Sequence, residues 1–453
     1  MNDIISAIST PFGKGGIAVI RISGSGSFEL ADKMFRPRSG KPLAERSGGR
    51  VVYGDILSGG ERIDDGCAVL FRAPNSYTGE DTVEISCHGG VLVTSRVYES
   101  TLLCGARPAG PGEFTRRAFL SGRMGLTQAE AVIDLIDAEN EEAMRLAAAG
   151  TSGILARETA AIREQIISVL AAAYVQTDYP DEELSDLDTI GLENSIEELI
   201  RRTSALAATY RTGHAVSAGI DTVICGRPNT GKSSLLNMLL GRERAIVTSV
   251  AGTTRDTIEE KCTLGRVTLA LCDTAGIHHS DDTVERMGID RAREKLAECE
   301  LALAVFDISE PLCDDDRDII ASLDPQKTVI ILNKSDLKNV LTAADFASFP
   351  RVLAISCEDH HGLDELRATV EEMFIDGSID YSKAVITNSR QHAAVTRALE
   401  YLGSALEASR SGLTSDMAGL DLELAAGAIG ELDGLTVLGE VVDGIFSRFC
   451  VGK

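Results

Sequence analysis

The 453 residues include 69 acidic and 44 basic side chains, and the net charge of −25 argues against a protein that binds nucleic acid through its own positive field alone. The length favours two to four domains, and 44% apolar residues are ample for their cores although only 4% of the chain is aromatic. Ten cysteines without a CxxC pair, and the lack of a signal peptide or long apolar run, predict a cytoplasmic protein with reduced thiols and no membrane span.

Residues 1–118 are predicted to form an α+β domain. Short runs of β-branched and apolar residues, separated by Gly, Pro and Ser, are typical of strands. The predicted strands are Ile17–Ile22, Val51–Tyr53, Ala68–Phe71 and Thr82–Ser86.

A helical pattern begins at Thr127, which has the spacing of a capping box with Glu130. Ala-rich segments with apolar residues at helical spacing continue to Tyr179–Pro180 and resume in Ile196–Tyr210. This part of the chain predicts several helices.

Near Asp221 the pattern changes to alternating strands and helices, which continue to about Phe374. Helical segments return in Arg390–Ala408, Asp421–Ile429 and Val437–Phe449. The simplest architecture is one helical domain built from both flanks, with an α/β domain inserted into it. The predicted domain limits are 1–118, 119–216, 217–377 and 378–453.

The inserted domain opens with Thr222–Ser234 (TVICGRPNTGKSS), a predicted strand followed by the P-loop pattern GxxxxGK[ST]. Gly226 and Gly231 let backbone N–H groups converge on phosphates. Lys232 reaches the terminal phosphates, and the Ser233 hydroxyl can bind Mg²⁺.

Further nucleotide motifs follow in the order that a GTPase requires. Asp273–Gly276 (DTAG) belongs near Mg²⁺ and the γ-phosphate. Val329–Asp336 ends in Asn-Lys-Ser-Asp, and the Asp336 carboxylate can accept from the N1–H and 2-amino groups of guanine, which adenine does not offer. The segment Ser356–Glu358 closes the base site, so GTP binding by a Ras-like domain is predicted. The predicted nucleotide contacts are Asn229, Thr230, Gly231, Lys232, Ser233, Ser234, Thr248, Ser249, Val250, Ala251, Gly252, Thr253, Thr254, Asp273, Thr274, Ala275, Gly276, Asn333, Lys334, Ser335, Asp336, Ser356, Cys357 and Glu358.

The group that activates water is not evident from these motifs. Ile277 stands where Ras-type enzymes carry the glutamine that orients the attacking water. Arg227 and Arg255 are candidate arginine fingers, although a solvated or structural role fits each of them better. Gly252–Asp256 (GTTRD) lies in the switch I region, where one threonine should close over Mg²⁺ when the γ-phosphate is present.

The remaining signals lie outside the G domain. They are DIISAISTPFGKGGIAVIRISG near the start, PNSYTGEDTVEISCHGG (Pro74–Gly90), PGEFTRRAFLSGRMGLTQAEAVIDLI (Pro111–Ile136) and the terminal FCVGK. Together with GRPNTGKSSLLN, AGTTRD and DTAGI they resemble, over nearly the whole chain, the MnmE (TrmE) family of tRNA modification GTPases.

This resemblance implies a homodimer whose N-terminal domain binds 5-formyl-tetrahydrofolate or a related one-carbon folate, and whose helical domain carries the G domain. It implies an FAD-dependent partner, MnmG (GidA), with which the protein adds an aminomethyl or carboxymethylaminomethyl group to C5 of the wobble uridine of certain tRNAs. The partner is then expected to supply much of the basic surface for tRNA.

Residue roles follow from the same resemblance. The implied folate contacts are Arg21, Glu84, Arg123 and Lys453, and the family often has lysine where Arg123 stands. The implied K⁺ ligands are Asn229, Thr248, Val250 and Thr253. Thr254 is implied to join Ser233 on Mg²⁺, and Glu285 to orient the catalytic water.

The C-terminal Phe449–Lys453 (FCVGK) allows two interpretations of Cys450. A prenylation box fits poorly, because Gly452 is not aliphatic and no polybasic run precedes it. The resemblance implies instead a thiol near the modification chemistry, acting either as a nucleophile or structurally.

Two other classes of function compete with a tRNA-modifying enzyme. One is a regulatory GTPase of the ribosome-assembly type, which would lack the folate segments and the terminal cysteine. The other is a folate-binding scaffold with vestigial GTP hydrolysis, which the complete set of nucleotide motifs disfavours.

Overall fold

The computed structural model describes residues 3–178, 189–242, 260–271, 296–375, 377, 379–411, 415–435, 437 and 439–453. The chain divides into two compact units. One comprises Met1–Ile133, Thr151–Arg163 and Ile429–Lys453, and the other comprises Asp134–Gly150 and Glu164–Ala428.

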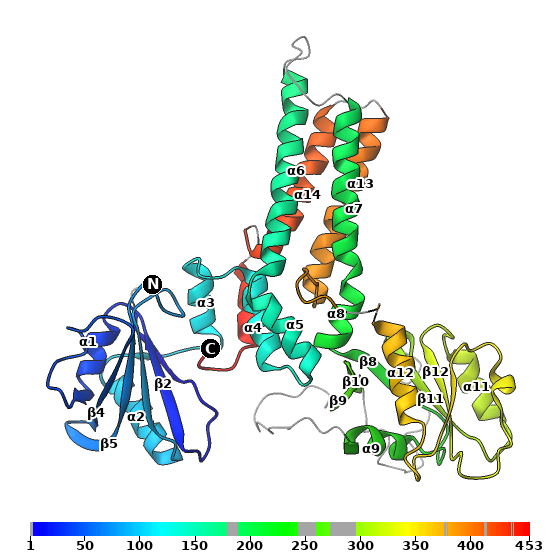
Figure 1. The fold of residues 1–453 in the computed structure, drawn as a ribbon, viewed down its shortest axis with the longest axis horizontal. Helices are drawn as coiled ribbons and strands as arrows, with labels where there is room; N and C mark the ends of the chain where they lie inside the picture. Colours follow the sequence, from blue (N-terminus) through cyan, green and yellow to red (C-terminus); the bar gives the residue numbers. More distant parts are fainter. Residues whose placement is uncertain are drawn as a thin grey trace. The chain divides into compact units, whose positions relative to one another are not determined.

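The first unit is built on a seven-stranded sheet with the order β3-β4-β5-β6-β2-β1-β7 (Figure 1). Its strands are β1 (Ile5–Ile8), β2 (Ile17–Ser23), β3 (Phe35–Pro37), β4 (Arg50–Ser58), β5 (Glu61–Phe71), β6 (Thr82–His88) and β7 (Arg107–Pro108). Helices α1 (Ser27–Asp32) and α2 (Val91–Leu103) pack on it. The four predicted strands are confirmed, and each is longer in the structure. The strands that were not predicted are short.

Strands β2 and β6 fix the register that matters for the site. They are antiparallel, and Arg21 lies opposite Glu84. Ile20 and Ile22 on the same strand are fully buried in the core. Because side chains alternate along a strand, Arg21 and Glu84 lie on the face opposite that core.

Besides α1 and α2, the first unit contains α3 (Glu113–Leu120), α4 (Leu126–Ile136) and α15 (Gly439–Ser447), and α4 extends into the next unit. The predicted capping box at Thr127 is wrong, because α4 begins one residue before it. The Gly125 N–H instead donates to Gln128 Oε1 at 3.0 Å, and the Thr127 hydroxyl donates to Asp433 at 3.2 Å.

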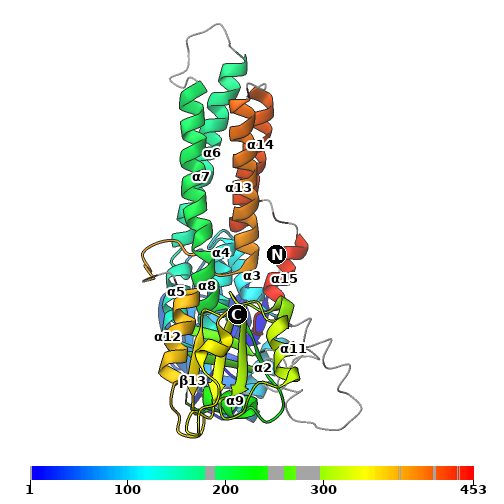
Figure 2. The same ribbon diagram turned by 90° about the vertical axis from the view of Figure 1, so that its right-hand side faces the viewer.

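The helical domain is made from both flanks of the inserted domain, as the sequence predicts. Helices α6 (Ile154–Asp178), α7 (Thr189–Ala208), α13 (Ser389–Arg410) and α14 (Ser415–Gly430) run side by side (Figures 1 and 2). The same domain contains the shorter helices α5 (Glu141–Thr151) and α8 (Tyr210–Ser217). Among the described residues, no helix combines the length and apolar character that a bilayer crossing needs.

The inserted domain has a six-stranded sheet with the order β13-β12-β11-β8-β10-β9, in which only β9 is antiparallel to its neighbour. The strands are β8 (Ile220–Cys225), β9 (Glu260–Leu264), β10 (Val267–Leu271), β11 (Leu301–Asp307), β12 (Thr328–Asn333) and β13 (Val352–Ile355). Its helices include α9 (Lys232–Arg242), α11 (Asp314–Ser322) and α12 (Leu363–Phe374). Figure 2 shows α11 and α12 on opposite faces of the sheet. Both faces are thus covered, which is why β11 and β12 are continuous apolar runs. This is a Ras-like P-loop fold.

Candidate functional site

The P-loop connects the end of β8 to the start of α9. Three of its residues have positive φ, Gly226 at 144°, Asn229 at 65° and Gly231 at 101°. The Lys232 ammonium donates to the carbonyls of Gly226 and Arg227, both at 2.8 Å. Burial disfavours the charged form and lowers the pKa of Lys232. The loop thus surrounds a cation at the N-terminus of a helix, which is a typical arrangement for binding phosphate.

The hydroxyl residues of the loop differ in exposure. Thr230 is buried, and its hydroxyl donates to the Arg227 carbonyl at 3.0 Å. Ser233 and Ser234 lie exposed in the first turn of α9. A serine hydroxyl is the hard oxygen ligand that Mg²⁺ prefers, so the position of Ser233 fits its predicted role.

Asn333 links the P-loop to the loops that are predicted to bind guanine. Its buried Nδ2 donates to the Thr230 carbonyl at 2.9 Å, and its Oδ1 accepts from the Cys357 N–H at 3.3 Å. A Cβ at Gly231 would lie 2.0 Å from Asn333 Nδ2, so this approach needs a glycine. The three motifs therefore hold one another in place.

Asp336 lies at the end of the Asn-Lys-Ser-Asp motif. Its Oδ1 accepts from the Ser356 hydroxyl at 2.6 Å, and the same hydroxyl accepts from the Asp359 N–H at 3.1 Å. Burial and the nearby Asp336 carboxylate raise the pKa of Cys357 to about 11. The Cys357 thiol is therefore neutral at pH 7, and the carboxylate is the acceptor at this position. Glu358 beside it is exposed.

Lys334 and Ser335 anchor the same motif to the sheet. The Lys334 ammonium donates to Asp307 Oδ2 at 2.5 Å, and the Ser335 N–H donates to the Ile355 carbonyl at 3.2 Å. Burial would raise the pKa of Asp307, but the bonds from Lys334 and Ser309 outweigh it and lower that pKa. Asp307 is therefore a charged anchor for Lys334.

Arg227, a candidate arginine finger, is held by carboxylates. It forms ion pairs with Glu310 and, at 3.3 Å, with the buried Asp316. These contacts favour a structural role. Several other predicted residues lie outside the described residues: Thr248, Ser249, Val250, Ala251, Gly252, Thr253, Thr254, Arg255, Asp273, Thr274, Ala275, Gly276, Ile277 and Glu285.

The first unit brings the predicted folate contacts Arg21 and Glu84 together. Arg21 Nε donates to Glu84 Oε1 at 2.8 Å, and both side chains are largely buried. The Arg21 guanidinium also lies 5.2 Å from the Tyr77 ring centroid and 5.5 Å from that of Phe114. The two rings are close enough for cation–π attraction.

The C-terminal tail, defined as Cys450–Lys453, docks at the same place. The Gly452 carbonyl accepts from Arg21 Nη1 at 3.3 Å and from the Ser9 hydroxyl at 3.1 Å. The Phe114 N–H donates to the Lys453 carbonyl at 3.2 Å. Gly452 has a φ of 107°, and a Cβ there would lie 2.4 Å from the Ile8 carbonyl oxygen. Glycine is therefore required for this close approach.

The remaining predicted residues of this site differ in position. Burial and the nearby Arg21 lower the pKa of Lys453, although Glu84 acts in the opposite direction. Cys450 is exposed. Arg123 is exposed as well, and among the described residues no hydrogen bond or ion pair joins it to Arg21 or Glu84.

The sequence prediction missed Tyr77 and Phe114, although both lie in the quoted segments SYTGED and PGEFTRR. Aromatic residues beside motif acids and arginines were a signal that could have identified them. A guanidinium, a carboxylate and two rings suit a planar ligand that has both carboxylates and N–H donors.

Two family models together match nearly the whole chain. The model described as the MnmE helical domain matches residues 126–450, and the model described as the GTP-binding protein TrmE N-terminus matches residues 4–123. The tRNA modification GTPase MnmE of Roseiflexus sp. is 41% identical over 466 aligned positions, covering 100% of this chain and 99% of that protein. The tRNA modification GTPase MnmE of Symbiobacterium thermophilum is 42% identical over 457 positions, with the same coverage.

The similarity to solved structures covers a smaller share of the chain than the similarity to these relatives. Era of Aquifex aeolicus is 26% identical with a TM-score of 0.28, covering 40% of this chain and 66% of that chain. The G domain of FeoB from T. maritima is 22% identical with a TM-score of 0.25, covering 34% of this chain and 98% of that chain.

Proposed function

The chain belongs to the MnmE family of tRNA modification GTPases, and we propose that it hydrolyses GTP to drive modification of the wobble uridine of certain tRNAs. The product is a uridine with an aminomethyl or carboxymethylaminomethyl group at C5. An FAD-dependent protein of the MnmG (GidA) type is the proposed partner, in a hetero-oligomer whose core is a homodimer of this chain.

The observation that carries the proposal is the docked C-terminal tail. It brings Gly452 and Lys453, two and three residues after Cys450, beside Arg21 and Glu84, the residues proposed to bind a one-carbon folate. A regulatory GTPase has no need of a thiol delivered to such a site. Arg21 and Lys453 are proposed to bind the ligand carboxylates and Glu84 the N–H groups, with Arg123 as a peripheral contact.

GTP binding is supported by the bonds that join the P-loop to the Asn-Lys-Ser-Asp motif. Asn333 bonds the Thr230 carbonyl, and Ser356 positions Asp336 for the guanine edge. Specificity for guanine follows, because a carboxylate there would face an acceptor on adenine.

Hydrolysis is proposed to need Mg²⁺ and K⁺. Ser233 and Thr254 would hold Mg²⁺, which neutralises phosphate charge. The proposed K⁺ ligands are Asn229, Thr248, Val250 and Thr253. Glu285 would orient the water, because Ile277 cannot accept a hydrogen bond.

The proposed location is the cytoplasm, where GTP, tRNA and reduced thiols coexist. Within the chain, the proposed limits of the N-terminal, first helical, G and second helical segments are 1–118, 119–216, 217–377 and 378–453.

The test is mass spectrometry of wobble nucleosides in tRNA from a strain in which this gene is deleted. We expect the C5-modified uridines to disappear and to return when the wild-type chain is supplied. Unchanged modified uridines together with defective ribosomal subunits would support the assembly-type alternative instead.

A further inference from the structure

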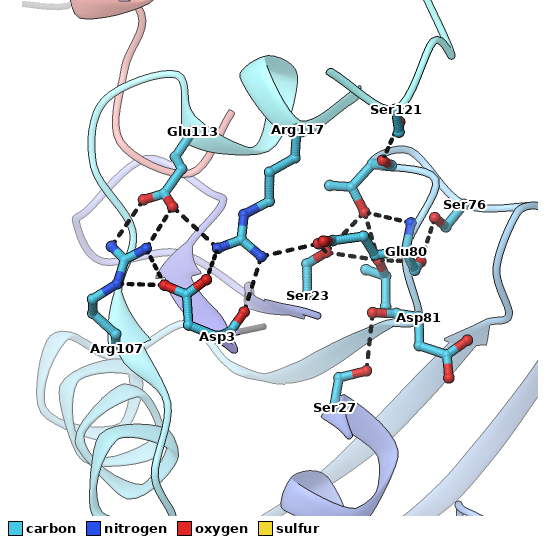
Figure 3. Close-up of polar contacts among 12 residues, drawn as sticks. Asp3, Ser23, Ser27, Ser76, Glu80, Asp81, Arg107, Glu113, Arg117 and Ser121 are labelled. Atoms are coloured by element: carbon cyan, nitrogen blue, oxygen red, sulfur yellow. Dashed lines mark hydrogen bonds and ion pairs between the residues drawn. The ribbon is translucent and has the colours of Figure 1, made fainter. Parts of the chain in front are cut away.

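Arg117 on α3 is a buried arginine with no place in the chemistry above. It is 3% exposed, and its guanidinium lies among the three carboxylates of Asp3, Glu80 and Glu113 (Figure 3). Nη1 donates to Glu80 Oε2 and to the Asp3 carbonyl, both at 3.0 Å. Nη2 donates to Asp3 Oδ1 at 2.9 Å and to Glu113 Oε1 at 3.2 Å.

A second arginine completes the cluster. Arg107 donates to Asp3 Oδ2 at 2.7 Å and to Glu113 Oε1 at 2.6 Å. Arg117 is the more important of the two for position, because it alone reaches Glu80 and is the more deeply buried. Several charge-assisted bonds from one planar group fix direction as well as distance.

The three carboxylates come from the segments that surround the tail. Asp3 precedes β1, and Glu80 lies in the loop that carries Tyr77. Glu113 is the first residue of α3 and precedes Phe114. Arg117 therefore ties together the segments that carry the two rings beside Arg21.

The start of α3 is also the platform on which the tail rests. Phe114 donates its N–H to the Lys453 carbonyl, and Pro111 forms an antiparallel bridge with Val451. A Cβ at Gly112 would lie 2.5 Å from the Phe446 carbonyl oxygen, so α15 contacts the same turn closely. Any shift of this turn moves the contacts of the tail.

We propose that Arg117 is a positioning residue that holds the C-terminal tail on the N-terminal sheet and thereby sets where Cys450 lies. Without Arg117, Glu113 keeps its bonds to Arg107, but the guanidinium that joins it to Glu80 is lost, so the loop that carries Glu80 is no longer bonded to α3 through this cluster. The larger core of the sheet lies on the other face of β2, and Phe114 itself packs on Ile5 and Ala7, so we expect the tail to be released without unfolding of the sheet. Only the link to the chemistry of Cys450 rests on the proposed function.

The experiment measures how fast a carboxypeptidase specific for basic residues removes Lys453, followed by intact mass. A free peptide covering 444–453 gives the rate for an unbound tail. We expect slow removal from the wild-type chain and removal roughly tenfold faster or more from Arg117→Gln. Arg117→Lys keeps the charge but not the fork, so its rate should fall between the two. Arg62→Gln, which removes an exposed arginine with carboxylate partners, should behave as the wild type.

Hydrogen exchange separates release of the tail from unfolding. Amides of β2 and β6 should stay protected in Arg117→Gln while those of 110–116 and of the tail exchange faster. If the sheet of Arg117→Gln loses protection, Glu113→Gln is used in its place, because it changes only one of the three carboxylates that Arg117 binds. Removal of Lys453 from Glu113→Gln is again expected to be faster than from the wild type. The proposal is overturned if folded Arg117→Gln loses Lys453 at the wild-type rate. It is also overturned if Arg117→Lys loses Lys453 as fast as Arg117→Gln. Neither result depends on whether wobble uridine is modified.

Discussion

The side-chain amide of Asn333 donates to the Thr230 carbonyl at 2.9 Å, so the end of β12 is bonded directly to the P-loop. The same side chain accepts from the Cys357 N–H. The loops proposed to bind phosphate and base thus share one buried residue, and we expect a shift of either loop to be transmitted to the other.

This bond predicts a large effect of Asn333→Ala on nucleotide binding. The change leaves the Thr230 carbonyl and the Cys357 N–H without their partner, which costs roughly 1–3 kcal/mol and corresponds to about 10- to 100-fold weaker binding of GTP. The measurement is titration with a fluorescent GTP analogue. Asn237→Ala on the exposed side of α9 is the matched control, and equal affinity in both variants would show that the link is dispensable.

Base specificity is predicted to depend on Asp336. Asp336→Asn exchanges an acceptor for a donor, so the variant should lose affinity for GTP and gain affinity for xanthosine triphosphate, which presents a carbonyl in place of the 2-amino group. The expected loss is several kcal/mol, because buried groups remain unpaired with guanine. Competition titration with both nucleotides tests this, and undiminished GTP affinity would remove Asp336 from the base site.

The P-loop could be predicted because its chemistry is local in the sequence. Gly226, Gly231, Lys232 and Ser233 all lie in the loop between β8 and α9 or in the first turn of α9, so the sequence motif alone specifies the local geometry. The link through Asn333 could not be predicted, since it depends on how the loops after β12 and β13 meet the P-loop in three dimensions.

The residues around the C-terminal tail could be predicted only from the family resemblance, because they are far apart in the sequence. Arg21 lies 63 residues from Glu84 and 431 residues from Gly452 in the sequence. Only the antiparallel register of β2 and β6 and the docking of the tail bring them together. Arg117 carries no sequence signal, because its importance comes from burial among carboxylates. Helix α4 begins earlier than the sequence predicts. Thr127 is a residue type that often caps helices, but in the structure it lies inside the helix, and this depends on tertiary contacts that the sequence does not show.

The Arg117 cluster predicts a pH dependence that Glu113→Gln should remove. Burial would raise the pKa of Glu113, but the bonds from Arg107, the Gly110 N–H and Arg117 outweigh it and hold that pKa below 4.5. A lowered pKa in the folded state contributes stability above pH 4.5 that is lost as the pH falls through the folded value. The wild type should therefore be more stable than Glu113→Gln at pH 7, by roughly 2 kcal/mol, and the gap should narrow below pH 4.5. This difference in stability is measured by urea unfolding, with hydrogen exchange of the α3 peptide as the signal. A difference that does not change with pH would contradict a lowered pKa of Glu113.

Cys450 is predicted to matter for modification and not for GTP turnover. The thiol and the P-loop belong to different compact units. Cys450→Ser should leave steady-state GTP hydrolysis within about twofold of the wild type and abolish or sharply lower the C5-modified wobble uridine. Cys104→Ser is a control for loss of a thiol elsewhere in the same unit. Normal modified-nucleoside levels in Cys450→Ser would make the thiol a packing residue, and a prenyl adduct found by intact mass would make it an anchor.

Hydrolysis is predicted to depend on potassium. Ile277 cannot polarise water, and Arg227 is bound to Glu310 and Asp316, so neither residue supplies the catalytic charge. An arginine finger accelerates GTPases by ~10³–10⁵, and a K⁺ ion beside the phosphates can supply part of that electrostatic effect. Asn229 lies in the P-loop with a φ of 65°, and it is the P-loop residue proposed to bind K⁺. Potassium should therefore stimulate turnover, and sodium, which is too small for the same cage of oxygens, should do so poorly.

Two variants separate the ion from the water. Asn229→Ala should lose the response to potassium and still bind nucleotide, because the backbone of the P-loop and Lys232 remain. Glu285→Ala should be slow in potassium as well, because it removes the group that orients the water. Steady-state hydrolysis in KCl and NaCl at one ionic strength, for the wild type and both variants, tests these expectations. Equal wild-type rates in the two salts would rule out the potassium mechanism, whereas full activity of Glu285→Ala would assign the orientation of the water to another residue.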